Sequence, residues 1–232
     1  MPYRRLPKTD AARQRALKIL LDNDSIYTAR NKFVDWKLLS KAREVYDKFY
    51  TACEQHRLAS LRRIRYGAKN TSLHYNAAMY ASHFVQVLFM TVERREIKPQ
   101  QLELYGLPTD KTAMPDLKTA EGLLEWVPRI VGGEKKRLKV GGRPIYNPTI
   151  SMVATHFDIF KESYMRLKEL TQKEEKAYAD VRDMRVEADN VILDIWNQIE
   201  EHYKDATPEI RFAECRKLGV VYYYRRNEEH LY

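Results

Sequence analysis

The chain has 232 residues, which is long enough to bury a hydrophobic core as one domain or as two small ones. Hydrophobic residues make up 44% of it and charged residues 31%, which excludes a disordered chain, and only 8 Gly and 9 Pro argue against a loop-rich β protein. A mainly α fold is therefore expected. The formal net charge of +9 makes a polyanion one class of partner to consider.

The two cysteines, Cys53 and Cys215, cannot form a disulfide framework, and neither belongs to a Cys-x-x-Cys or Cys/His cluster. They are predicted to be buried thiols in a reducing cytosol. The first 15 residues lack the apolar core of a secretory signal, and apolar runs such as residues 84–90 are far shorter than the ~18–20 residues that span a bilayer. We expect a cytoplasmic protein without a membrane partner.

The first predicted elements are two helices. Thr9 is expected to cap a short helix over residues 10–22. From Trp36 to His56, apolar and aromatic residues recur at steps of three and four, which predicts a helix that reaches to about Arg65.

A turn is predicted next, at Gly67 and the polar residues that follow it. Ser72 could cap another helix, because the apolar rhythm resumes from Leu73 to Thr91. The helices on the two sides of the turn are expected to fold back as an antiparallel hairpin.

The middle of the chain is predicted to contain a helix and a small β-hairpin. Thr119 caps the helix, and Pro128 kinks or ends it. Residues 137–140 and 143–146 flank a Gly-Gly pair that suits a two-residue hairpin turn. Residues 220–226 are also typical of a strand and could add a third one.

The last predicted long segment begins at Asn147-Pro148, a strong helix start. Neither Gly nor Pro occurs from residue 150 to residue 203. One helix of that length would measure about 80 Å at ~1.5 Å per residue, whereas a compact chain of this size is roughly 45 Å across. A turn is therefore expected in residues 170–178, with a single protruding helix as the alternative.

The two predicted hairpins are followed by similar short segments, so an internal duplication is one interpretation. A short Pro-started segment ends at Gly106 after the first hairpin, and another ends at Gly219 after the second. The alternative is the chance likeness of two helical hairpins. The expected division is a basic arm with the first hairpin in residues 1–118, a connection in 119–146, and the second hairpin with a strand-like tail in 147–232. These segments could also pack as one domain, so that the fold is one bundle or two tandem bundles.

The stretch "VGGEKKRLKVGGRP", residues 131–144, raises the question of a phosphate-binding loop. Its glycines match neither the Gly-x-x-x-x-Gly-Lys-Ser/Thr loop nor the Gly-x-Gly-x-x-Gly fingerprint, so an ordinary turn is favoured. None of the six histidines follows a Glu at the spacing of a di-metal bundle site, and no His-Glu-x-x-His occurs. The sequence predicts no catalytic, cofactor-binding or metal-ligating residue.

Charge is distributed unevenly. Residues 1–157 carry 28 Lys and Arg and 15 Asp and Glu, whereas residues 158–205 carry 8 and 13. No acid occurs from Gln55 to Val92. Two groups of basic residues are candidates for binding a polyanion. The candidates are Arg57, Arg62, Arg63, Arg65 and Lys69 in the first group, and Lys135, Lys136, Arg137, Lys139 and Arg143 in the second.

Four segments, "YRRLPKTDAARQRAL", "GGRPIYNP", "DIWNQIEEHY" and "LGVVYYYRR", resemble a bacterial family of mainly helical proteins. The resemblance covers most of the chain and implies a helical, cytoplasmic protein. It implies no substrate, cofactor or catalytic residue, because no activity is established for that family.

The leading functional hypothesis is a non-enzymatic interaction or scaffold protein that holds another protein, or a second copy of itself, with helix faces and the basic end. A nucleic-acid or other polyanion-binding protein is the alternative, and an enzyme ranks third. The competing interpretation is that the acidic second half satisfies the basic first half within the protein.

Overall fold

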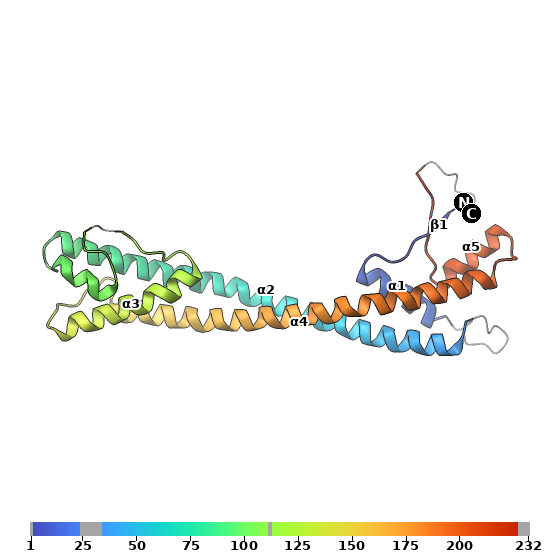
Figure 1. Ribbon diagram of the computed structural model, residues 1–232, viewed down its shortest axis with the longest axis horizontal. Coiled ribbons are helices and arrows are strands. Elements are labelled where there is room, and N and C mark those ends of the chain that lie inside the picture. Colours follow the sequence, from blue (N-terminus) through green and yellow to red (C-terminus); the bar gives the residue numbers. More distant parts are fainter. Residues whose placement is uncertain (1, 24–33, 111–112, 227–232) are drawn as a thin grey trace. The chain divides into compact units, whose positions relative to one another are not determined.

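The computed structural model describes residues 2–23, 34–110 and 113–226 and is mainly helical, which confirms the predicted fold class (Figure 1). Two short strands also form. In chain order the elements are β1 (Tyr3–Arg4), α1 (Asp10–Leu21), α2 (Trp36–Glu93), η2 (Pro99–Tyr105, a 3-10 helix), α3 (Ala120–Lys139), α4 (Ile150–His202), α5 (Pro208–Lys217) and β2 (Tyr222–Tyr223). None of the helices in these described ranges is both long enough and apolar enough to cross a membrane.

The chain forms two compact units. The terminal unit comprises Met1–Ser60 and Lys173–Tyr232, and the central unit comprises Leu61–Gln172. Helices α2 and α4 each contribute one part to each unit. The core of the terminal unit is therefore built from both ends of the sequence, and that of the central unit from its middle.

The long helix α2 corrects the prediction of a turn at residues 67–72. Gly67 and Ser72 both lie inside the helix, and the Thr71 hydroxyl donates a hydrogen bond to the Gly67 carbonyl. A glycine in a helix interior costs about 1 kcal/mol relative to alanine. Burial of apolar side chains on both sides of Gly67 outweighs that cost, so the predicted hairpin does not form and the partner of α2 is α4.

Helix α4 is likewise unbroken, so the turn expected in residues 170–178 is wrong. The polar Thr171 stays in the helix and donates its hydroxyl to the Leu167 carbonyl. The length argument assumed one compact domain, whereas α4 belongs to two units.

The two long helices run antiparallel within each unit. In the terminal unit, Phe49 and Ala52 of α2 pack with Val181 of α4. In the central unit the stacked rings of Tyr80 and His156 have their centroids 4.0 Å apart. Four elements contribute to the central core. Buried in it are Phe84 and Leu88 of α2, Leu102 and Tyr105 of η2, Val127 and Ile130 of α3, and Phe157 and Phe160 of α4.

Helix α1 is fixed to α4 in the terminal unit by an apolar core and by ion pairs. The guanidinium of Arg13 donates two hydrogen bonds of 2.8 Å to Asp189, and that of Arg185 donates two of 2.8 Å to Asp10. Such bidentate pairs are directional as well as strong. The hydrogen bonds to Asp189 raise the pKa of Arg13 above its ordinary value.

The predicted β-hairpin does not form, although β2 lies in residues 220–226, where a strand was predicted. Strand β1 pairs antiparallel with β2, with Tyr3 opposite Tyr223 and Arg4 opposite Tyr222. Residues 137–139 are the last turn of α3, and residues 143–146 form no strand with them. The physical reason lies in the buried side of α3, where Ile130, Gly133, Glu134 and Arg137 recur at helical spacing.

The helix starts predicted at Thr9 and Thr119 are confirmed, whereas α3 does not end at Pro128 and α4 does not start at Asn147-Pro148. Thr9 accepts from the Ala12 N–H at 3.2 Å, and Thr119 accepts from the Gly122 N–H at 3.0 Å. Pro128 lies inside α3 without ending it. The start predicted at Asn147-Pro148 is wrong by two residues, because Thr149 caps α4 by accepting from the Met152 N–H at 3.3 Å.

Replacement of Gly67 by Ala tests the continuity of α2. A Cβ there would meet only Leu167 Cδ1, at 3.9 Å, which is an ordinary contact. Gly67→Ala should raise the free energy of unfolding by about 0.5–1 kcal/mol, as measured by urea denaturation followed by circular dichroism. As a contrast, Gly133→Ala should lower it, because its Cβ would lie 2.7 Å from the Leu104 carbonyl oxygen. A loss of stability in Gly67→Ala would contradict a helical Gly67.

Candidate functional site

The strongest candidate for a partner surface lies on the part of α2 that belongs to the central unit. We define the α2 basic face as Leu61, Arg62, Ile64, Arg65 and Lys69. The three cationic side chains are exposed, and Leu61 and Ile64 are 51% and 55% exposed. These residues lie on the side of α2 away from α4, because the buried positions Asn70, Ala77 and Ala81 fall on the opposite side of the helix.

The charge of the α2 basic face is not neutralised within the described residues. None of these forms an ion pair with Arg62, Arg65 or Lys69. The nearest acid on α2 in the N-terminal direction is Glu54, and there is none in the C-terminal direction before Glu93. An incoming acidic group would therefore meet three cations on a stretch of α2, between Glu54 and Glu93, that carries no carboxylate.

Two other residues of the first basic group differ from the α2 basic face. Arg57 belongs to the terminal unit and donates to Glu54 at 2.8 Å from Nη2, and this hydrogen bond raises the pKa of Arg57. Arg63 is half-buried. Neither offers its whole charge to a partner at the α2 basic face.

The second basic group is not joined to the α2 basic face. Lys135 lies in a groove with Ala154 and Lys161 of α4, near the start of that helix, whereas Gly67 of α2 is closest to Leu167 further along. Lys135, Lys136 and Lys139 on α3 and Arg143 beyond it are exposed. The structure therefore separates the predicted cations of the central unit into two patches.

Arg137 is unlike the other candidates, because its side chain is only 2% exposed. Its Nη2 donates to Glu134 Oε1 at 2.7 Å and to the Arg143 carbonyl at 2.7 Å, and its Nε donates to Glu134 Oε2 at 2.9 Å. The Tyr105 hydroxyl donates to the same carboxylate at 2.5 Å and accepts from Arg137 Nε at 2.9 Å. Burial and the bond to Glu134 raise the pKa of Tyr105. This guanidinium is occupied within the core and is not available to a ligand.

Two of the four glycines of residues 131–144, Gly133 and Gly142, lie close to the same network. A Cβ on Gly133 would lie 2.7 Å from the Leu104 carbonyl oxygen and 2.8 Å from the Tyr105 ring. A Cβ on Gly142 would lie 2.7 Å from Arg137 Nη1. The stretch that raised the question of a phosphate loop is therefore the place where η2 packs closely on α3 over a buried ion pair.

Histidine side chains contribute to packing. The ring of His56 lies 5.4 Å from that of Tyr178, and the ring of His74 lies 5.3 Å from that of Phe160. Within the described part of the chain, no group of three or more His, Cys, Asp or Glu side chains has the arrangement of a metal site.

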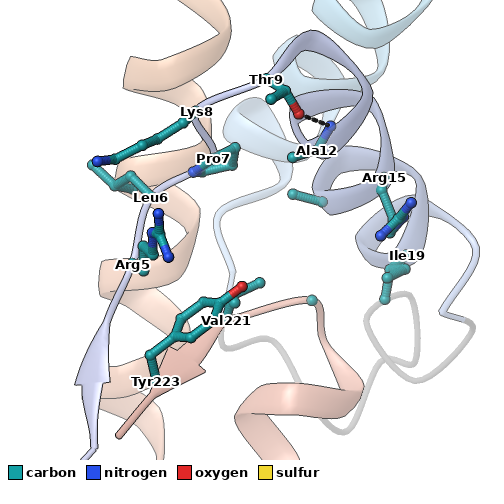
Figure 2. Close-up of a pocket in the computed structure, with 12 residues that line it drawn as sticks. Arg5, Leu6, Pro7, Lys8, Thr9, Ala12, Arg15, Ile19, Val221 and Tyr223 are labelled. Atoms are coloured by element: carbon teal, nitrogen blue, oxygen red, sulfur yellow. Dashed lines mark hydrogen bonds between the residues drawn. The ribbon is translucent and has the colours of Figure 1, made fainter. Parts of the chain in front are cut away.

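A third basic group, which the sequence analysis missed, lines a cavity of about 310 Å³ in the terminal unit (Figure 2). Its cations are Arg5 and Lys8 from the arm before α1, and Arg15 from α1. Tyr223 of β2 closes one side of the cavity. The sequence identifies the basic arm but does not join it to Arg15 in one site, because the pairing of β1 with β2 is what brings the walls of the cavity together.

Comparison of the chain with models of known protein families, with curated proteins and with solved structures found no match. The expectation drawn from the four family-like segments therefore stays a prediction.

The buried network makes a prediction about stability. Arg137→Ala should lower the free energy of unfolding by about 3–5 kcal/mol, because it leaves the Glu134 carboxylate buried without its cation. Lys136→Ala, an exposed neighbour on α3, should change it by less than about 0.5 kcal/mol. Urea denaturation measures both. The double replacement Glu134→Leu with Arg137→Met should recover most of the loss, since it removes both charges together. Equal stability of the two single variants would show that the ion pair is not buried.

Proposed function

We propose that this chain is a non-enzymatic interaction protein that holds an acidic partner protein on the α2 basic face. One observation carries the proposal: Arg62, Arg65 and Lys69 are exposed beside the exposed Leu61 and Ile64, and no residue of the described ranges forms an ion pair with them. Exposed aliphatic side chains beside cations are typical of an interface between two proteins, which has an apolar centre with a polar rim.

The chemistry of the α2 basic face indicates what the partner presents. Removal of Leu61 and Ile64 from water contributes about 25 cal/mol for each Å² of apolar surface that is buried. Arginine is favoured in interfaces because its planar guanidinium binds carboxylates through two parallel hydrogen bonds. The fitting partner is an amphipathic helix or strand with an apolar stripe flanked by Asp and Glu. A second copy of this chain has a net charge of +9 and is therefore not an acidic protein, although its residues 158–205 carry 13 acids against 8 bases.

The alternative function is binding of a nucleic acid or another polyanion. It is favoured by the absence of acids from Gln55 to Val92, which leaves a run of helix with only positive charge. Leu61 and Ile64 support the protein partner instead, because a phosphate backbone gives two exposed aliphatic side chains nothing to pack against. If three phosphates were bound, the logarithm of the binding constant would fall with a slope of about −2.7 against the logarithm of the salt concentration.

The proposal includes a cytoplasmic location. Its support is the cysteine chemistry: Cys53 and Cys215 are free, and burial raises the pKa of the Cys215 thiol, which keeps it protonated and unreactive.

Two triple variants with the same loss of charge test the proposal. One replaces Arg62, Arg65 and Lys69 of α2 by Gln, and the other replaces Lys135, Lys136 and Lys139 of α3 by Gln. The full chain, immobilised, is exposed to nuclease-treated cell extract, and a photoreactive residue in place of the exposed Ala68 records what lies on the α2 basic face. One acidic protein should crosslink and be retained by the wild type and by the α3 triple variant. The α2 triple variant should retain at least tenfold less of it.

A second pair of replacements separates the two functions. Leu61→Ser with Ile64→Ser should weaken binding of a partner protein at least tenfold, because it removes the apolar centre while keeping all three cations. Binding of a random DNA duplex would be unchanged by the same pair. Loss of the captured material on nuclease treatment, or equal losses in the two triple variants, would contradict the proposed protein partner.

A further inference from the structure

The terminal unit contains a cavity, whereas the α2 basic face belongs to the central unit. The walls of the cavity are the arm of residues 5–9, one side of α1, and residues 219–223 (Figure 2). Its volume of about 310 Å³ is at the lower end of the ~300–1,000 Å³ that small-molecule sites occupy. The space is too small for a folded partner and suits a small molecule.

Among the described residues, the charged side chains that line the cavity are all positive. Arg5, Lys8 and Arg15 line it, and no acidic side chain of residues 2–23, 34–110 or 113–226 does. The acid nearest in sequence is Asp10, whose carboxylate accepts from Arg185 at 2.8 Å and from Arg13 at 3.3 Å. That carboxylate is therefore already paired, and the charge of the three lining cations is left for a ligand.

Two contacts hold Arg5 in place at the cavity. Its backbone N–H donates to the Val221 carbonyl at 2.9 Å, which extends the ladder of β1 and β2. Its guanidinium carbon lies 4.9 Å from the centre of the Tyr223 ring. Figure 2 shows Arg5 on the side of the arm and Arg15 on the side of α1, with Tyr223 below them. A guanidinium that is positioned before binding loses less freedom when an anion arrives.

Apart from Thr9, the side chains that line the rest of the wall are mainly apolar. Leu6 from the arm and Ile19 from α1 are 38% and 39% exposed, and Ala12 and Val221 complete this surface. Gly219, with φ of +90°, allows the C-terminal segment to approach α1, because a Cβ there would lie 3.1 Å from the Ala16 carbonyl oxygen. An apolar wall beside unpaired cations requires two different parts in one ligand.

We propose that this cavity binds a small organic anion with a carboxylate or phosphate head and a short apolar body. The head lies between Arg5 and Arg15, and the body packs against Leu6, Ala12 and Ile19. Inorganic phosphate would satisfy the cations but leave the apolar wall in water, and a neutral apolar molecule would leave the cations without a partner. The inference does not rest on the proposed function of α2.

Calorimetric titration of the full chain with four probes tests the ligand class. The probes are hexanoate, phenyl phosphate, inorganic phosphate and hexanol. Hexanoate or phenyl phosphate should bind one to one and at least tenfold more tightly than either inorganic phosphate or hexanol, and the tighter of the two identifies the head group. Absence of saturable binding by both organic anions, or equal affinity for inorganic phosphate, would overturn the inference.

Matched variants locate the binding. Arg15→Gln should weaken binding of the tighter probe at least tenfold, whereas Lys18→Gln removes the same charge from an exposed position of α1 that does not line the cavity and should leave affinity unchanged. Ala12→Phe should fill the space and abolish binding while the helical circular dichroism signal is retained. Equal effects of the Arg15 and Lys18 replacements, or full binding by Ala12→Phe, would place the ligand elsewhere and contradict the proposal.

Discussion

The packing of α2 against α4 is the interaction on which the rest of the structure depends. Within each unit the two helices run antiparallel and bury aromatic and aliphatic side chains between them, such as Phe49 with Val181 and Phe84 with Phe160. One side of α2 is buried by this packing, and the other side is exposed to solvent. The basic and apolar residues within 61–69 that form the α2 basic face lie on the exposed side.

The shorter helices are held in each unit by networks of ion pairs and hydrogen bonds. In the terminal unit, α1 is held by bidentate pairs between Arg13 and Asp189 and between Arg185 and Asp10. In the central unit, η2 is held on α3 by the buried bonds among Tyr105, Glu134 and Arg137. The pair of Glu134 with Arg137 is fully buried, and misplacement of either residue would leave an unpaired charge in the core. Both networks use residues that look like ordinary surface charges in the sequence.

The sequence predicts features set by neighbouring residues and misses those set by distant ones. Thr9 and Thr119 are identified as caps because the capping hydroxyl and the N–H it accepts from are three residues apart. Gly67 misleads, because a helical glycine costs only about 1 kcal/mol and the burial that offsets it comes from α4. The pair Gly141 and Gly142 wrongly predicted a β-hairpin, because the residues before it, predicted as a strand, are the last turn of α3. Arg137 was interpreted as a surface cation, although its spacing from Ile130, Gly133 and Glu134 already indicated the buried side of a helix.

The candidate sites differ in the same way. Arg62, Arg65 and Lys69 are neighbours on one helix, so a stretch without acids is enough to find them. Arg5, Lys8 and Arg15 become a site only when β2, from the other end of the chain, closes the cavity.

The order of elements also repeats, since a short helix, a long helix and a Pro-started short helix follow each other twice. An internal duplication stays a prediction.

The central claim is that α2 is one helix that packs on α4 with one side and presents the α2 basic face with the other. A distance between spin labels at Arg62→Cys and Gln86→Cys tests it most directly, with Cys53 replaced by Ser and Cys215 inaccessible to the label because it is fully buried. Both labelled positions are exposed and lie in the central unit. A continuous helix predicts a separation of about 36 Å at ~1.5 Å per residue. A helical hairpin that turns at residues 67–72 would bring the labels within about 20 Å and would contradict the account.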